Sequence, residues 1–226
     1  MHPFIYLASQ SPRRQELLTQ IGVQFELLLA DSSEDTESLE MQLPDEPALA
    51  YVKRVTLAKL AAAKQRLHAR GLPSAPILCA DTTVALSLED ENKHQQDNQN
   101  KSTKEIILGK PTDHQDAKRI LQLLSGKTHQ VHTAVAVAGK PHINDDEPKL
   151  LVSSSHVTFK SLTEEEINAY ILSNEPMGKA GAYGIQGIGG CLISSISGSY
   201  SGIMGLPLYE TSQLMHETGV QFSLKP

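Results

Sequence analysis

Two adjacent arginines near the start of the chain, Arg13 and Arg14, are the residues most suggestive of chemistry. The apolar run at residues 4–8 predicts a strand, and Pro12 after Ser11 predicts a helix with Ser11 at its N-cap. Both arginines then fall in the first helical turn, where the positive end of the helix dipole disfavours cations. A bound anion explains this placement, because a strand–loop–helix junction is a favourable phosphate site. The alternative is that both side chains point into water.

A single carboxylate, Asp81, is the strongest catalytic candidate. It follows the apolar residues 77–80 and is expected at the end of a buried strand, where an uncompensated charge is costly. A metal ion or nearby basic side chains would compensate it, although Asp81 could also cap a turn. Glu34 lies in an acidic segment and by itself indicates a solvated charge. Mg²⁺ needs only one or two carboxylates besides substrate phosphates, so Glu34 and Asp81 together would suffice.

Three further positions could contact a ligand. Lys110 stands between Gly109 and a proline, Lys59 lies on a predicted helix, and Gln186 lies among four glycines. A glutamine amide has both a donor and an acceptor, which suits reading the edge of a pyrimidine base. The simpler interpretations are an ordinary turn, a surface lysine and a β-bulge.

Several other classes of protein are excluded or disfavoured. His129 and His132 are three apart on a predicted strand, so their side chains face opposite sides and cannot share a zinc ion. No G-x-S-x-G or G-x-x-x-x-G-K-[ST] motif occurs. The net charge of −6 argues against nucleic-acid binding. Two distant cysteines, and no apolar run long enough to span a membrane, predict a cytoplasmic protein.

The remaining pattern predicts a mixed α/β fold around one twisted sheet flanked by helices, in a single domain covering residues 1–226. A polar insertion is expected at about residues 89–105. The predicted strands are 4–8, 25–29, a strand that begins at 77–80, 106–108, 129–138, 150–159 and 191–196. The predicted helices are 12–21, 46–70, one capped by Thr112 or Asp113, 164–171 with a capping box at Thr163, and 208–218.

Seven segments, in this order, resemble the Maf family of nucleoside triphosphate pyrophosphatases over nearly the whole chain. They are residues 9–18 (SQSPRRQELL), Arg54 with Lys59, 80–82 (ADT), 109–111 (GKP), 129–133 (HQVHT), 179–187 (KAGAYGIQG) and 205–208 (GLPL). The resemblance implies two lobes with a deep cleft, an architecture related to the inosine triphosphate pyrophosphatases. It also implies a divalent cation, Mg²⁺ or Mn²⁺, and cleavage between the α- and β-phosphates.

The resemblance also implies roles for individual residues. Asp81 would be the general base or a metal-linked carboxylate, with Glu34 helping to hold the metal. Ser9, Arg14, Lys59 and Lys110 would hold phosphates. Arg13, Thr82 and Gln186 would select the base. This combination is similar to the branch that hydrolyses dTTP and UTP, whereas the branch for 7-methyl-GTP typically has Trp, Gln and Glu at these positions.

Two departures from the family pattern stand out: Ser33 precedes Glu34 where a second acidic residue is common, and the polar insertion is unusually long. A homodimer is expected by analogy, with a nucleoside triphosphate as substrate and neither nucleic acid nor membrane as partner. The alternative functions are a 7-methyl-GTP-type pyrophosphatase and a non-catalytic nucleotide-binding regulator of cell division.

Overall fold

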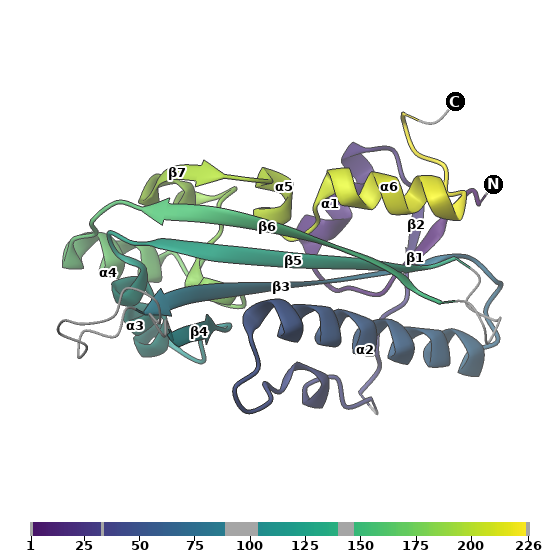
Figure 1. The fold of residues 1–226 in the computed structure, drawn as a ribbon, viewed down its shortest axis with the longest axis horizontal. Helices are drawn as coiled ribbons and strands as arrows, with labels where there is room; N and C mark the ends of the chain where they lie inside the picture. The colour runs from purple at the N-terminus through teal and green to yellow at the C-terminus, as the bar shows by residue number, and fades with distance from the viewer. Residues whose placement is uncertain (1, 33, 89–103, 140–146, 225–226) are drawn as a thin grey trace, which may run out of the picture. The chain divides into compact units, whose positions relative to one another are not determined.

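The fold is built on a mixed β-sheet (Figure 1). The computed structural model describes residues 2–32, 34–88, 104–139 and 147–224. Among these residues, seven strands form a sheet in the order β2-β1-β3-β5-β6-β7, with β4 paired to β3. β1 pairs in parallel with β2 and β3, whereas the β3–β4 and β6–β7 pairs are antiparallel. The predicted fold class, a mixed α/β sheet flanked by helices, is therefore confirmed.

The strands are β1 (Ile5–Leu7), β2 (Phe25–Leu27), β3 (Ile77–Leu88), β4 (Lys104–Leu108), β5 (Thr128–Ala138), β6 (Lys149–Phe159) and β7 (Ile193–Ser197). The α-helices are α1 (Pro12–Gln20), α2 (Ala48–Ala69), α3 (His114–Leu124), α4 (Glu164–Leu172), α5 (Tyr200–Met204) and α6 (Leu208–Thr218). Short 3₁₀ helices lie at η1 (Ser38–Glu40), η2 (Ala180–Ala182) and η3 (Ile188–Leu192). None of the helices within the described ranges is both long and apolar enough to cross a membrane.

The chain divides into two compact units. Unit 1 comprises Met1–Thr82, Thr133–Ser154 and Ser199–Pro226, and unit 2 comprises Thr83–His132 and Ser155–Gly198. Each unit is described separately below.

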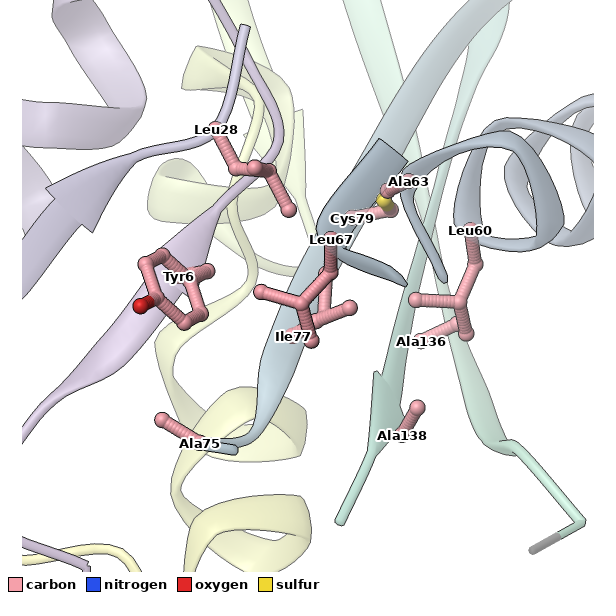
Figure 2. Packing of buried hydrophobic residues seen from close by; sticks show 10 residues of the cluster. All are labelled: Tyr6, Leu28, Leu60, Ala63, Leu67, Ala75, Ile77, Cys79, Ala136 and Ala138. Carbon is pink, nitrogen blue, oxygen red and sulfur yellow. The ribbon is translucent and has the colours of Figure 1, made fainter. Parts of the chain in front are cut away.

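The core of unit 1 forms where α2 packs on its strands (Figure 2). Leu60, Ala63 and Leu67 recur at helical spacing on α2, and each is at most 1% exposed. Ile77 and Cys79, two residues apart on β3, present the facing surface. Complete burial of each leucine contributes about 2 kcal/mol, so this contact fixes α2 against β3. The cluster is completed by Tyr6, Leu28, Ala75, Ala136 and Ala138.

Local sequence signals place two helices of unit 2. Asp113, one of the two predicted caps, accepts a hydrogen bond from Asp116 N–H at 2.8 Å and begins α3. Thr163 and Glu166 form the predicted capping box of α4, with each side chain bonded to the other residue's backbone N–H. Short-range hydrogen bonds of this kind depend on a few consecutive residues, which is why the sequence predicts them well.

Three predictions about the elements need correction. Asp81 does not end a strand: β3 continues through it to Leu88, because the β-branched residues that follow favour extended backbone. β4 begins at Lys104, two residues before the strand predicted from residue 106, and residues 89–103 of the predicted insertion lie outside the described residues. Ser33 also lies outside them. The short helix α5 was not predicted, because five residues show no clear helical period.

Candidate functional site

The carboxyl end of β1 defines a candidate site in unit 1. β1 pairs with β3 as far as Leu7 opposite Leu78, and Ala8 N–H then donates to the Leu78 carbonyl at 3.0 Å. β3 continues beyond this point, so Asp81 and Thr82 follow where the chain of β1 turns away into α1. Open α/β sheets bind ligands at the carboxyl ends of their strands, which makes this the expected place for a substrate.

Asp81 lies against a lysine from α2. Its Oδ1 is 2.6 Å from Lys59 Nζ, and its side chain is only 12% exposed. Lys59 Nζ also contacts Glu40 Oε1 at 2.7 Å. One ammonium group therefore bridges two carboxylates, and it compensates the charge that a buried Asp81 carries. Lys59 is therefore a nearby basic side chain of the kind expected beside Asp81 from the sequence.

Glu40 was missed by the sequence reasoning. It is one of several acidic residues at 31–46, and nothing in its neighbours distinguishes it. Side chains of α2 fix its position: the Tyr51 hydroxyl donates to the Glu40 carbonyl at 2.8 Å, and Arg54 Nη2 donates to the Met41 carbonyl at 2.9 Å. Arg54 also forms a two-bond ion pair with Glu46. The helix thus holds η1 where Glu40 can contact Lys59.

The pKa values near this cluster reflect burial and the clustered carboxylates. The pKa of Tyr51 is raised to about 12, first by burial and then by the negative charges of Asp81 and Glu40. Burial lowers the pKa of Arg14, although the charge of Asp81 acts in the opposite direction. The charge of Asp81 thus acts on both Tyr51 and Arg14.

The carboxylates of this cluster suit a divalent cation that takes only one or two of its ligands from the protein. Asp81 and Glu40 face one positive centre, the Lys59 ammonium, so two carboxylates are within reach of the same position. Nowhere in the described ranges do three or more His, Cys, Asp or Glu side chains gather as a metal site. Mg²⁺ bound through one or two carboxylates and substrate phosphates matches this set better than an all-protein cage does.

Both arginines at the start of α1 are held by backbone carbonyls at the end of α5. Arg13 Nε donates to the Met204 carbonyl at 3.1 Å, and Arg14 Nε donates to the Gly205 carbonyl at 2.8 Å. Arg14 Nη1 also donates to Ser9 Oγ at 3.0 Å. Ser11 occupies the predicted N-cap position, but its hydroxyl makes no capping bond. The guanidinium groups are thus oriented at a helix end that no side chain caps.

Thr82 belongs to a chain of hydroxyl groups with a defined direction. Thr133 Oγ1 donates its proton to the Gly202 carbonyl at 2.7 Å, so at the 3.0 Å contact with Thr82 it must accept. Thr82 is therefore the donor there, and its oxygen accepts from Arg14 Nη2 at 3.5 Å. The predicted specificity residue Thr82 thus helps to orient Arg14. Thr133, which the sequence reasoning did not select as a site residue, sets the direction.

Glu34 has a different partner from Asp81. Arg66 Nε and Nη2 donate to its two carboxylate oxygens at 2.8 and 2.6 Å. Arg66 lies seven residues after Lys59 on α2, which is about 10 Å along the helix axis. The structure therefore brings Glu40, and not Glu34, to the ammonium group that Asp81 contacts.

Lys110 and Gln186 lie in unit 2. Lys110 is exposed directly after β4, and the adjacent Gly109 carbonyl accepts from Gly181 N–H at 3.1 Å. Gln186 is exposed in the glycine-rich loop at 184–190. The structure does not test the roles predicted for these two residues.

The two histidines of the H-x-x-H pattern have separate surroundings on β5. His129 is buried and its Nε2 is 2.9 Å from the Tyr183 hydroxyl. Burial lowers the pKa of His129 to about 4, and burial also lowers that of His132. Both are therefore neutral at pH 7, and no metal group includes them within the part of the chain that the structure describes.

Comparisons with known proteins identify the family of this chain. A relative from Albidiferax ferrireducens, named dTTP/UTP pyrophosphatase, is 51% identical over 97% of this chain and 98% of its own. Proteins of the same name from Ralstonia nicotianae and Cupriavidus pinatubonensis are 52% and 49% identical, over 97% and 98% of this chain and 96% and 100% of their own. The Maf-like protein family profile matches residues 4–218, and the chain therefore belongs to the Maf family.

Proposed function

We propose that this protein hydrolyses dTTP and UTP to the nucleoside monophosphate and pyrophosphate. The observation that carries the proposal is the contact between Asp81 and Lys59 in the same unit as the two anchored arginines. Catalysis of phosphoanhydride hydrolysis uses a group that positions the attacking water and cations that stabilise the developing negative charge, and Asp81 with Arg14 and Lys59 could supply both. Relatives about 50% identical over nearly their whole length bear the name dTTP/UTP pyrophosphatase.

In the proposed mechanism, the Asp81 carboxylate orients a water molecule and accepts its proton as the oxygen attacks the α-phosphorus. The bond between the α-phosphorus and the bridging oxygen breaks, and pyrophosphate leaves with the electron pair. Arg14 and Lys59 stabilise the negative charge that develops on the leaving group. Lys59 has a second role, because its Nζ contacts Asp81 Oδ1 at 2.6 Å and so positions the carboxylate.

The proposal includes a divalent cation, Mg²⁺ or Mn²⁺. Asp81 would hold it together with Glu40, because both carboxylates reach the position of the Lys59 ammonium, which would turn to the substrate phosphates. Glu34, whose carboxylate pairs with Arg66, would take part only if that pair opened. When bound, the cation would neutralise negative charge on the phosphates and lower the pKa of a water molecule that it coordinates.

We assign base selection to Arg13, Thr82 and Gln186, and further phosphate contacts to Ser9 and Lys110. A site that pairs hydrogen-bonding groups with the base edge rejects mismatched bases strongly. A panel of nucleoside triphosphates tests this assignment, with dTTP and UTP expected to give the highest kcat/KM. If 7-methyl-GTP were the best substrate, the assignment to the dTTP/UTP branch would be wrong.

The decisive experiment is pyrophosphate release from dTTP by the Asp81→Asn variant with Mg²⁺ present. Loss of the proton acceptor is expected to lower kcat by about 10²–10⁴-fold. Asp45→Asn is the matched control: it makes the same charge change at an exposed residue whose positive φ of 53° suits asparagine. Wild-type activity in Asp81→Asn would exclude the mechanism, and a wild-type protein that binds dTTP without hydrolysing it would indicate a regulator.

The proposal also includes a cytoplasmic location and a homodimer. Size-exclusion chromatography with light-scattering detection measures the oligomeric state. A mass twice the 24.6 kDa of one chain is expected for the homodimer.

A further inference from the structure

The glycine-rich loop at 184–190 is held by a carboxylate outside it. Glu175, which follows α4, accepts hydrogen bonds from two backbone N–H groups of the loop: Gly189 donates to Oε1 and Ile188 donates to Oε2, both at 2.9 Å. Glu175 and the loop belong to unit 2. Two backbone amides that could cradle a phosphate in such a loop are thus occupied by a side chain of the same protein.

A tyrosine extends this bracing to the start of the loop. The Tyr170 hydroxyl donates to Glu175 Oε1 at 2.9 Å and accepts from Gly184 N–H at 3.1 Å. The anchored amides of Gly184 and Ile188 flank Gln186 on both sides along the chain. Burial raises the pKa of Glu175, but the bonds from Gly189, Ile188 and Tyr170 outweigh it and lower the pKa overall. The carboxylate is therefore ionised at pH 7, which strengthens each bond.

Two of the loop's glycines are explained by this bracing. A Cβ atom at Gly187 would lie 2.2 Å from Glu175 Oε2, and one at Gly189 would lie 2.5 Å from Tyr170 Oη. A Cβ at Gly184 would lie 3.4 Å from the Gln186 amide nitrogen, so the glutamine side chain folds back over the loop there. Gly187 and Gly189 let a carboxylate and a hydroxyl approach the backbone, and no phosphate is needed to account for these two glycines.

We propose that Glu175 is a positioning residue for base selection. It fixes the loop backbone on either side of Gln186 and so holds the Gln186 side chain in place to read the base. The inference rests on the proposed function, because it assigns Gln186 to reading the pyrimidine edge. At that edge, the base of dTTP has a carbonyl group where the base of dCTP has an amino group. Loss of the carboxylate lets the loop sample other conformations, so discrimination falls while the chemistry at Asp81 is retained.

Glu175→Gln tests the proposal. A neutral amide cannot accept all three hydrogen bonds, because one carboxylate oxygen is replaced by a donor NH₂ group. The ratio of kcat/KM for dTTP over dCTP is expected to fall about 10-fold, with kcat for dTTP within about threefold of wild type. Tyr170→Phe removes only the hydroxyl and is expected to give a smaller fall. Glu165→Gln, the same charge change at an exposed residue of α4, is the matched control.

A double-mutant cycle separates positioning from general destabilisation. If Glu175 acts through Gln186, then Glu175→Gln should lower the ratio no further once Gln186→Ala is present. Multiplicative effects of the two substitutions would overturn the proposal. So would an unchanged dTTP/dCTP ratio in both Glu175→Gln and Tyr170→Phe, since the bonds would then serve stability alone.

Amide hydrogen exchange tests the bracing without reference to activity. The N–H groups of Gly184, Ile188 and Gly189 are expected to exchange at least 10-fold faster in Glu175→Gln than in wild type. If the wild-type protein hydrolysed neither dTTP nor UTP, the proposed function would fail while this measurement still decided the bracing. Unchanged exchange at these three amides would overturn the bracing itself.

Discussion

At the level of single residues, two carboxylates that both qualified as metal ligands have different partners. Asp81 contacts Lys59, which Glu40 also contacts, whereas Glu34 forms a two-bond pair with Arg66. The Arg66 side chain is only 6% exposed, so its guanidinium depends on that partner. The structure thus separates Glu34 from the cluster that contains Asp81.

The stability of the Glu34 pair should depend on pH. The hydrogen bond from Arg66 holds the pKa of Glu34 below its ordinary value of 4.5. A lowered pKa in the folded state stabilises the protein above the ordinary value, and this contribution is lost as pH falls through the lowered pKa. At pH 7, Glu34→Gln is expected to lower the free energy of unfolding by about 1–3 kcal/mol, because Arg66 keeps a weaker partner.

Urea unfolding between pH 7 and pH 3 measures this difference. The gap between wild type and Glu34→Gln should be constant near pH 7 and shrink below about pH 4.5. Glu37→Gln, at an exposed residue of the same acidic segment, is the control and should stay within about 0.5 kcal/mol of wild type. A gap that persisted unchanged to pH 3 would contradict the ion-pair explanation.

At the level of elements, short segments anchor the cations of the site. α5 has five residues, yet the carbonyls of Met204 and Gly205 at its end hold Arg13 and Arg14. The carboxyl end of a helix carries partial negative charge, which favours guanidinium groups there. Gly205 has a backbone φ of 123°, a conformation that residues other than glycine rarely adopt. The direction of its carbonyl therefore depends on glycine.

Gly205→Ala is expected to weaken both stability and substrate binding. Backbone strain should cost about 1–3 kcal/mol, and the displaced carbonyls should raise KM for dTTP several-fold as the arginines lose their anchors. Gly71→Ala is the control, because Gly71 also has positive φ, at 58°, and nothing lies within 4 Å of an added Cβ. It should lower stability without changing KM. Equal effects of the two variants on KM would show that α5 does not orient the arginines.

At the level of the whole molecule, each of the two units contains one cysteine. Cys79 is completely buried in the α2–β3 core of unit 1, and Cys191 is exposed in unit 2. Burial raises the pKa of the Cys79 thiol to about 12, so it is protonated as well as inaccessible at pH 8. The two thiols therefore differ in both exposure and reactivity.

Thiol labelling with Ellman's reagent should distinguish the two. One equivalent per chain is expected to react within minutes at pH 8, and the second only as fast as the core of unit 1 opens, because only the thiolate attacks. Cys191→Ser should abolish the fast phase and Cys79→Ala the slow phase. Rapid reaction of both thiols in the native protein would show that the α2–β3 contact is less stable than its burial indicates.

Much of the fold and part of the site could be predicted from local sequence. Caps such as Thr163 with Glu166 and the apolar run before Asp81 depend on neighbouring residues. The ordered motifs likewise identified Asp81 and the arginines as a set. The prediction that Asp81 ends a strand was wrong, because strand ends depend on tertiary pairing more than on the residue that follows.

Sequence alone thus determined the family, the charged residues available for chemistry and the elements that hold them. Only the tertiary structure decided which of these groups meet. Arg13 and Arg14 each bond a carbonyl 191 residues away, and a carbonyl is the same at every position, so no residue type marks it. Glu40 and Glu34 stand in one acidic segment, and the path of that segment over α2 assigns Lys59 to one and Arg66 to the other.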